Sequence, residues 1–274
     1  MGQIICITAF GLIIILAGLH VTYSSRFRHV SKALISTINS APSAVGVATG
    51  LPDIVSAFAQ RAGVRQDMLA RSVYLVQHAE IRMRRGGEWQ PLKARQSISI
   101  AQAGFAWEAQ QFVGPFTKIR ILDAYSNGEG QLQARFLGSI PLANETGQEL
   151  NRSELMRYLA ELPWAPDAIL GNLALQWTVL NPGKVEVSLE HPDGRVSVNL
   201  LFDSAGDIVE MQAKYRPVRE SDGTVVLRDW RGLFSRYGQL GNRRIPRKGE
   251  VGYLYDGVYE AYWRGDILDY VPNY

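Results

Sequence analysis

The sequence has little of what most metal centres and redox sites require. Only one of its 274 residues is cysteine, Cys6, and only four are histidine. A single cysteine excludes a disulfide within the chain and a cysteine metal cluster. The histidines, His20, His29, His78 and His191, are scattered, and no two have the spacing of a zinc-binding helix. The sequence therefore predicts neither a metal nor a cofactor.

A large excess of one charge sign is also absent. The chain has 29 basic and 26 acidic residues, a formal net charge of +3. This balance lacks the strong positive field of a nucleic-acid binder, so no nucleic-acid partner is expected. No nucleophile elbow, phosphate-binding glycine loop or dinucleotide fingerprint is present either. No residue is therefore predicted to be catalytic on the strength of a motif.

The first long apolar run is at the N-terminus. Residues Ile4 to Val21 carry no charge and are long enough to span a bilayer. A cleaved signal peptide is the alternative, but no Lys or Arg precedes the run and its length exceeds a usual signal core. We expect a retained single-pass helix that contacts membrane lipid in the bacterial cytoplasmic membrane. The oligomeric state stays open.

The basic residues Arg26, Arg28 and Lys32 follow this run directly. By the positive-inside rule they favour a cytoplasmic C-terminal side, but three charges at one end leave the side of the membrane open. The predicted organisation is a transmembrane helix with its basic flank over 1–32, a tether over 33–50 and a single domain over 51–274. A short helix is expected to open that domain at Asp53–Arg61.

Alternation of apolar and polar residues then predicts strands separated by tight turns. These turns, such as Asn127-Gly128 and Pro192-Asp193-Gly194, favour antiparallel hairpins. The expected strands are 72–83, 95–101, 104–112, 117–125, 131–137, 173–180, 184–191, 195–203, 208–215, 225–237 and 251–263.

A helical segment interrupts the strands at Asn151–Gly171. Asn151 is predicted to be the N-cap, with Glu154 as its capping-box partner. One face is apolar, because Leu155, Tyr158, Leu159 and Leu162 recur at helical spacing, and Pro163 is expected to stop the helix.

Together these patterns predict a mainly β, α+β fold. A meander of about ten strands tends to curl, and its apolar face has to be covered. We therefore expect a curled antiparallel sheet, a half-barrel, wrapped around the helical insert.

Several scattered motifs resemble an uncharacterised bacterial family whose members often begin with a membrane helix. They cover roughly residues 51 to 263: Leu51-Pro52, Gln77, Trp89-Gln90-Pro91, Gln96, Gly104-Phe105, Trp107, Asp123, Tyr125, Gly128, Gly130, Arg157 to Glu161, Trp164, Pro166 and Arg244-Ile245-Pro246. This family is similar in strand layout to the half-barrels of lipoprotein carriers. The resemblance implies a cavity for a hydrophobic, lipid-like ligand.

The candidate ligand-binding residues are aromatic side chains and one ion pair expected to face inward. Arg157 and Glu161 stand four residues apart on the helix, and either close the polar end of a cavity or form an ordinary surface pair. The tryptophans either line the ligand or simply fill the core. The full set is Trp107, Arg157, Tyr158, Glu161, Trp164, Trp177 and Trp230.

The predicted function is non-enzymatic binding or transport of a hydrophobic ligand by a membrane-anchored domain. One alternative is a hydrolase or isomerase that uses a facing pair of carboxylates, with Glu108 and Asp123 on neighbouring strands as candidates. A second alternative is a membrane-associated scaffold with a solid core and no ligand.

Overall fold

Thirteen strands form one antiparallel sheet in a computed structural model that describes residues 2–114, 116–220 and 222–274, with side chains of residues 2–9, 12 and 13 outside the description. The order across the sheet is β6-β5-β4-β3-β2-β1-β13-β12-β11-β10-β9-β8-β7. The strands are β1 (Ser72–Ile81), β2 (Gln90–Ser99), β3 (Phe105–Val113), β4 (Phe116–Ser126), β5 (Glu129–Phe136), β6 (Ile140–Thr146), β7 (Gln176–Asn181), β8 (Lys184–Leu189), β9 (Val196–Phe202), β10 (Ile208–Arg219), β11 (Val225–Leu240), β12 (Arg243–Tyr255) and β13 (Val258–Asn273).

The sheet consists of two meanders joined through β1 and β13. Ser72 pairs with Asn273 and Ile81 with Trp263, so the first and last strands of the domain lie side by side. The free edges, β6 and β7, are the strands before and after the helical insert. The mainly β antiparallel fold is thus confirmed, as an open sheet that does not close into a barrel.

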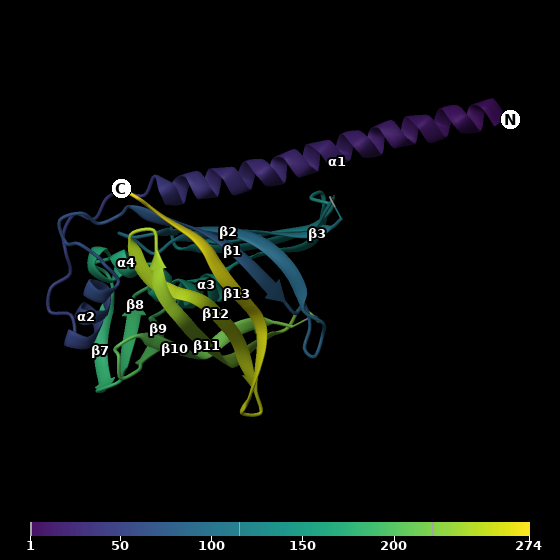
Figure 1. Cartoon of the computed structure of the whole chain (residues 1–274). Coiled ribbons are helices and arrows are strands. Elements are labelled where there is room, and N and C mark those ends of the chain that lie inside the picture. Colours follow the sequence, from purple (N-terminus) through teal and green to yellow (C-terminus); the bar gives the residue numbers. More distant parts are fainter. Residues whose placement is uncertain (1, 115, 221) are drawn as a thin grey trace.

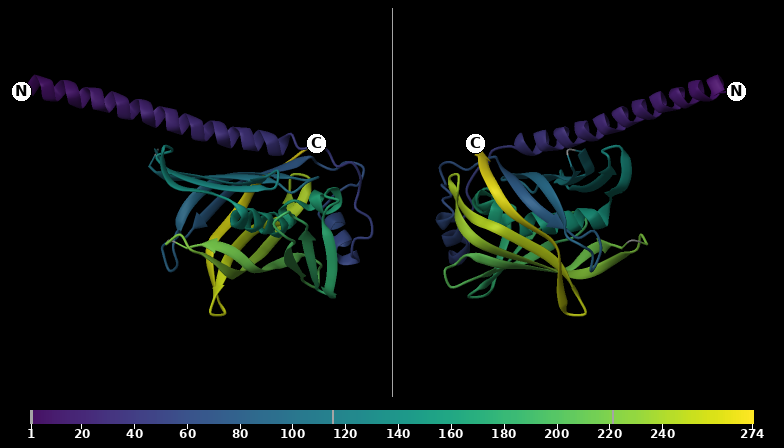
Figure 2. Two further views of the ribbon diagram at one scale, coloured as in Figure 1. Left: turned by 180° about the vertical axis from the view of Figure 1, so that it is seen from behind. Right: turned by 45° about the vertical axis from the view of Figure 1, so that its right-hand side comes forward.

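The helical insert lies on the concave side of this curved sheet (Figures 1 and 2). It consists of α3 (Gln148–Ala160), the short 3-10 helix η1 (Leu162–Trp164) and α4 (Pro166–Gly171). The predicted apolar face is buried, since Leu155, Tyr158, Leu159 and Leu162 are each at most 2% exposed. α3 contacts β4, β5 and β6 on one side and β9 and β10 on the other.

Side chains also hold the two ends of the curved sheet together. The His191 Nε2 atom, between β8 and β9, lies 3.0 Å from the carbonyl oxygen of Gly128, between β4 and β5. Arg219 on β10 pairs with Glu145 on β6 at 3.2 Å. The insert is therefore enclosed by the sheet, although the edge strands do not pair with each other.

Two predicted details of the local structure are wrong. α3 begins at Gln148, so Asn151 is not its N-cap. The Asn151 side chain instead accepts a hydrogen bond from the Gly130 N–H at 2.8 Å and donates one to Asp193 at 3.2 Å. The strand expected at 251–263 is the end of β12, a turn at Asp256-Gly257 and the start of β13, because Asp256 and Gly257 both take positive φ angles.

The first helix, α1 (Gly2–Asn39), continues past residue 32 and packs on the outer face of the sheet. Ile38 contacts Ala106 and Ala124, and the Ser31 hydroxyl donates to Glu108 at 3.2 Å. A second helix, α2 (Asp53–Arg61), contacts α4. Figure 1 shows the N-terminal part of α1 projecting beyond the sheet.

A transmembrane span at Ile4–Val21 is not supported. Within the described part of the chain, no helix is long and apolar enough to cross a membrane. Several side chains of the predicted span, residues 4–9, 12 and 13, lie outside the described residues. The division at residues 32 and 50 and the location in the cytoplasmic membrane stay predictions.

Trp164 connects the insert to the far wall of the sheet. Its indole N–H donates to the carbonyl oxygen of Pro246 at 2.8 Å, and its ring packs edge-on against Phe234 and Trp263. Gly249 on β12 leaves room for this ring, because a Cβ there would lie 2.6 Å from the indole. The position of the Trp164 ring therefore requires glycine, which has no side chain, at position 249.

We expect Gly249→Ala to lower the free energy of unfolding by about 1–3 kcal/mol, because overpacking displaces the Trp164 ring. The matched control is Gly238→Ala on β11, where a Cβ would meet only ordinary van der Waals contacts at 3.5 Å. Urea denaturation of both variants checks this. Equal stabilities would show that Trp164 is not held as described.

Candidate functional site

A small internal chamber lies between the insert and the concave face of the sheet. Its volume is about 110 Å³. One wall is apolar and largely aromatic, and is formed by Ile81, Trp107, Trp164, Met211, Trp230, Phe234, Val251, Tyr262 and Trp263. The polar side chains around it are Gln77, Gln96, Asp123, Arg157, Glu161 and Arg216.

A wider cleft of about 260 Å³ adjoins this chamber. The two share five lining residues: Ile81, Trp107, Asp123, Arg216 and Tyr262. The cleft is also lined by Glu154, by Tyr253 and by the Glu145–Arg219 pair that links β6 to β10. We call the two spaces the inner chamber and the outer cleft.

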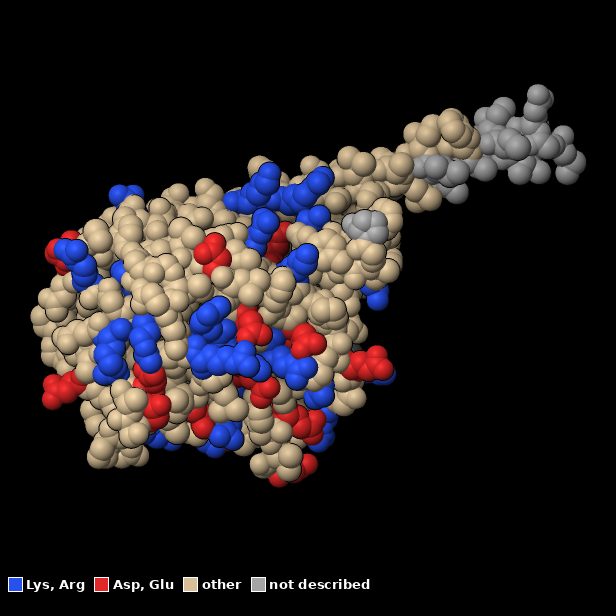
Figure 3. Space-filling view, in the orientation of Figure 1, with Lys and Arg blue, Asp and Glu red and all other residues tan. Residues whose placement is uncertain are grey.

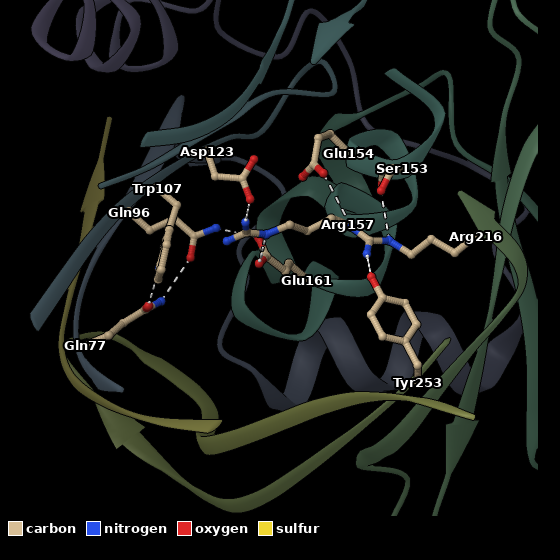
Figure 4. A network of polar contacts seen from close by, with 10 residues as sticks. All are labelled: Gln77, Gln96, Trp107, Asp123, Ser153, Glu154, Arg157, Glu161, Arg216 and Tyr253. Carbon is tan, nitrogen blue, oxygen red and sulfur yellow. Dashed lines mark hydrogen bonds and ion pairs between the residues drawn. The ribbon is translucent and has the colours of Figure 1, made fainter. Parts of the chain in front are cut away.

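Arg157 is the centre of the first half of the polar network (Figure 4). Its Nε donates to Glu161 at 2.9 Å and its Nη1 donates to the Asp123 carboxylate at 2.5 Å. The guanidinium carbon also lies 4.6 Å from the centre of the Phe105 ring. Arg157 is thus neutralised by two carboxylates and stacked on an aromatic ring.

Two glutamines extend this half of the network to the sheet wall. Gln96 donates to Glu161, and Gln77 donates to Gln96 at 2.9 Å. The Trp107 indole N–H donates to Gln77 at 2.8 Å. This series of hydrogen bonds fixes the orientation of Trp107, Gln77 and Gln96, because each donor has an acceptor in the next side chain.

Arg216 is the centre of the second half. Its Nη1 donates to the Tyr253 hydroxyl at 2.5 Å, and its guanidinium carbon lies 4.4 Å from the centre of the Trp230 ring. Its contact with Glu154 is long, at 3.4 Å, and so is its bond to the Ser153 carbonyl. Side chains of Arg216 and Glu154 are only 7% and 4% exposed.

The two halves differ in how well their polar atoms are satisfied. Among the described residues, eleven buried side-chain atoms have no hydrogen-bond partner, and three of them belong to this network: Asp123 Oδ1, Glu154 Oε2 and Trp230 Nε1. Such atoms are uncommon in folded proteins, because burial without a partner costs free energy. All three belong to residues that line the inner chamber or the outer cleft.

Burial and the neighbouring Asp123 raise the pKa of Glu154 to about 8. Burial also raises the pKa of Glu161, although Arg157 opposes the change. For Arg157, burial alone would lower the pKa, but Glu161 and Asp123 reverse the effect and keep the guanidinium charged. At neutral pH the Glu154 carboxyl is therefore mainly protonated, and Arg216 has no ionised partner in contact.

The structure brings five of the seven predicted ligand-binding residues to one place. Trp107, Arg157, Glu161, Trp164 and Trp230 all line the inner chamber. The other two, Tyr158 and Trp177, do not line it. Their positions therefore do not support the predicted role in binding.

Tyr158 is fully buried and receives a hydrogen bond from Asn172 at 3.1 Å. Trp177 is half-buried on β7, the edge strand beside β8. The sequence reasoning missed Arg216, Glu154, Tyr253 and Trp263. Alternation along the predicted strand 208–215 gave no signal for Arg216, because the register of β10 shifts between Ala213 and Arg216 and turns this side chain inward.

The proposed carboxylate pair is wrong. Trp107 is opposite Asp123 in the register of β3 and β4, so Glu108 is opposite Leu122 and points to the other face. Glu108 contacts Ser31 and lies 3.7 Å from Arg120, on the side that faces α1. Asp123 instead shares the interior with Glu154 and Glu161.

A larger hollow of about 660 Å³ lies on the outside of the sheet, across β1, β2, β12 and β13. It is an open groove lined in part by His78, Lys93, Lys248 and Arg264. Figure 3 shows Lys and Arg on this face interspersed with Asp and Glu. The interior network, with its buried unpaired atoms, is the stronger candidate site.

The chain belongs to a family of unknown function, DUF6544, whose model matches residues 44–265. The predicted membership in an uncharacterised family is thus confirmed. No curated protein matches the chain.

Several solved structures are similar in fold. A DUF1329 family protein from Desulfovibrio piger is 11% identical, with a TM-score of 0.45 over 81% of this chain and 94% of that one. A LolA superfamily protein from Nitrosomonas europaea is 10% identical, with a TM-score of 0.39 over 79% and 92%. A putative outer membrane lipoprotein-sorting protein domain from Vibrio parahaemolyticus is 7% identical, with a TM-score of 0.44 over 80% and 91%.

We expect the raised pKa of Glu154 to make folding pH-dependent. The folded form holds this proton up to about pH 8, whereas the unfolded form loses it near pH 4.5, so stability falls as pH rises between those values. Glu154→Gln removes this loss. It should change the unfolding free energy little at pH 5 and raise it by roughly 4 kcal/mol at pH 8.5.

Urea unfolding at both pH values measures the difference. Glu149→Gln, on the exposed part of the same helix, is the matched control and should keep the wild-type pH profile. A Glu154→Gln variant that is less stable than wild type at pH 8.5 would contradict a protonated Glu154.

Proposed function

We propose that this protein binds a small amphipathic ligand in the space beneath its curved sheet. The observation that carries this proposal is the combination of an aromatic wall with buried polar atoms that lack partners among the described residues: Asp123 Oδ1, Glu154 Oε2 and Trp230 Nε1. Ligand sites characteristically combine an apolar lining with a few converging polar groups. As expected from the sequence, we propose that the protein binds or carries this ligand and does not act on it as an enzyme.

The size of the space sets the size of the ligand. The inner chamber, about 110 Å³, is smaller than the ~150 Å³ apolar cavity that takes up benzene. It therefore holds a short apolar group, and the outer cleft of about 260 Å³ has to hold the rest. Together the two spaces come near the lower end of the range of about 300–1,000 Å³ found for ligand pockets.

A scaffold with a solid core does not require a buried ionic network. Replacing buried ionic groups with apolar side chains of similar volume is often neutral or stabilising. Here five ionisable side chains, Asp123, Glu154, Arg157, Glu161 and Arg216, are gathered beside an unfilled space. Recognition of a ligand gives these residues a role that packing alone does not.

We expect the neutral fluorescent probe N-phenyl-1-naphthylamine to bind the wild-type chain and to be displaced by 1-octanol. Ile81→Trp should reduce binding at least tenfold, because Ile81 lines both spaces and the larger ring fills their junction. A fluorescence titration measures both.

Val179→Trp, at an exposed position on β7, is the matched control and should bind like wild type. Absence of binding in the wild-type chain, or equal binding by Ile81→Trp, would contradict the proposal and favour the scaffold.

A further inference from the structure

The unpaired carboxylate oxygens indicate what the polar part of the ligand has to provide. Asp123 Oδ1 is a buried acceptor, Glu154 Oε2 becomes one when that carboxyl loses its proton, and neither has a hydrogen-bond partner among the described residues. The two carboxylates are near enough for the Asp123 charge to raise the pKa of Glu154, and Figure 4 shows Asp123 bonded to Arg157 and Glu154 in contact with Arg216. Each already contacts one arginine through its other oxygen, Asp123 with Arg157 and Glu154 with Arg216. The free oxygens are therefore available to one further hydrogen-bond donor.

The charges around these oxygens favour a cation over an anion. If all five interior groups were ionised, three carboxylates would oppose two guanidinium groups: Asp123, Glu154 and Glu161 against Arg157 and Arg216. Along the outer cleft Glu149 adds negative charge, whereas Glu145 and Arg219 pair with and neutralise each other. A bound cation would bring the charge of the interior close to zero.

Aromatic rings surround the same position. Trp107 and Tyr262 line both spaces, and Tyr253 stacks on Tyr262 with ring centres 5.0 Å apart. Aromatic faces attract cations, most strongly where water is excluded. The walls at the junction therefore suit a charged nitrogen as well as an apolar chain.

We propose that the ligand is a cationic amphiphile whose amino or guanidino group binds between Asp123 and Glu154 while its apolar part enters the inner chamber. This rests on the proposed function, since it assumes that a small molecule occupies the space. The nitrogen donates to Asp123 Oδ1 and Glu154 Oε2, and the apolar part contacts Trp164, Phe234 and Trp263.

Binding of such a cation is coupled to release of a proton. In the empty protein Glu154 is mainly protonated below about pH 8, and a cation beside it favours the ionised carboxylate. The groups that act on Glu154 are Asp123 from β4, Arg157 and Glu161 from α3, Arg216 from β10 and Tyr253 from β12. Affinity for a permanent cation should therefore rise with pH up to about 8 and then level off.

The test compares octyl compounds that differ only in their head group. Octylguanidinium, 1-octanol, octanoate and octyltrimethylammonium each compete with N-phenyl-1-naphthylamine for the full-length chain. Octylguanidinium should bind at least tenfold more tightly than the other three at pH 8, because it alone combines positive charge with N–H donors. Its affinity should rise by about tenfold per pH unit between pH 6 and 8.

Glu154→Gln should remove both the preference for octylguanidinium over 1-octanol and the pH dependence of octylguanidinium binding. Glu129→Gln, at an exposed position on β5, is the control and should behave like wild type. Octanoate binding as tightly as octylguanidinium, or a pH-independent affinity, would overturn the cation assignment while leaving ligand binding intact. Failure of every octyl compound to displace the probe would instead refute the proposed function.

Discussion

The interior position of α3 is the constraint on which the rest of the domain depends. This helix carries Glu154, Arg157 and Glu161 into the centre of a curved sheet, together with the apolar residues that fill the core. Charged groups in such surroundings are costly unless they are paired. The strands on both sides supply the partners, with Asp123 on β4 and Arg216 on β10. The polar network therefore links the insert to both meanders.

Pairing within the network is uneven, because the contacts of Arg157 are shorter than the contact between Arg216 and Glu154. Arg157 is held by two carboxylates at short distances and is stacked on Phe105. Arg216 and Glu154 contact each other only at 3.4 Å, and the second oxygen of Glu154 has no partner among the described residues. Each half has one carboxylate oxygen without a partner among the described residues, Asp123 Oδ1 and Glu154 Oε2, and these are the atoms that we propose a ligand completes.

Much of the fold could be predicted from the sequence, because alternation along strands and tight turns are local signals. The insert was located by its apolar face and by Pro163, and its place on the concave side followed from the need to cover the sheet. β6 was not predicted as a strand. Its apolar residues Ile140 and Leu142 are exposed on an edge strand, so the segment lacks the alternation of buried apolar and exposed polar residues. The prediction that Asn151 is an N-cap was wrong because its side chain forms hydrogen bonds with distant residues, Gly130 and Asp193, rather than with its own helix.

The site was predicted only in part, for a physical reason. Residues of one helix, such as Arg157 and Glu161, can be related by their spacing, but the meeting of α3 with β4 and β10 depends on how far the sheet curls. Glu108 and Asp123 point to opposite faces, because side chains alternate along β3 and Trp107, not Glu108, is opposite Asp123. Glu154 was predicted to serve a cap, yet the helix begins earlier and turns this residue inward.

The indole N–H resonances of the six tryptophans in a nitrogen–proton NMR spectrum test the central claim most directly. Trp107, Trp164, Trp230 and Trp263 line the inner chamber, whereas Trp89 stacks under Arg82 and Trp177 lies on the edge strand β7. On titration with octylguanidinium, the resonances of the four chamber tryptophans should shift and saturate together. Trp89 and Trp177 should stay in place. Unchanged chamber resonances, or shifts confined to Trp89 and Trp177, would contradict a ligand site beneath the sheet.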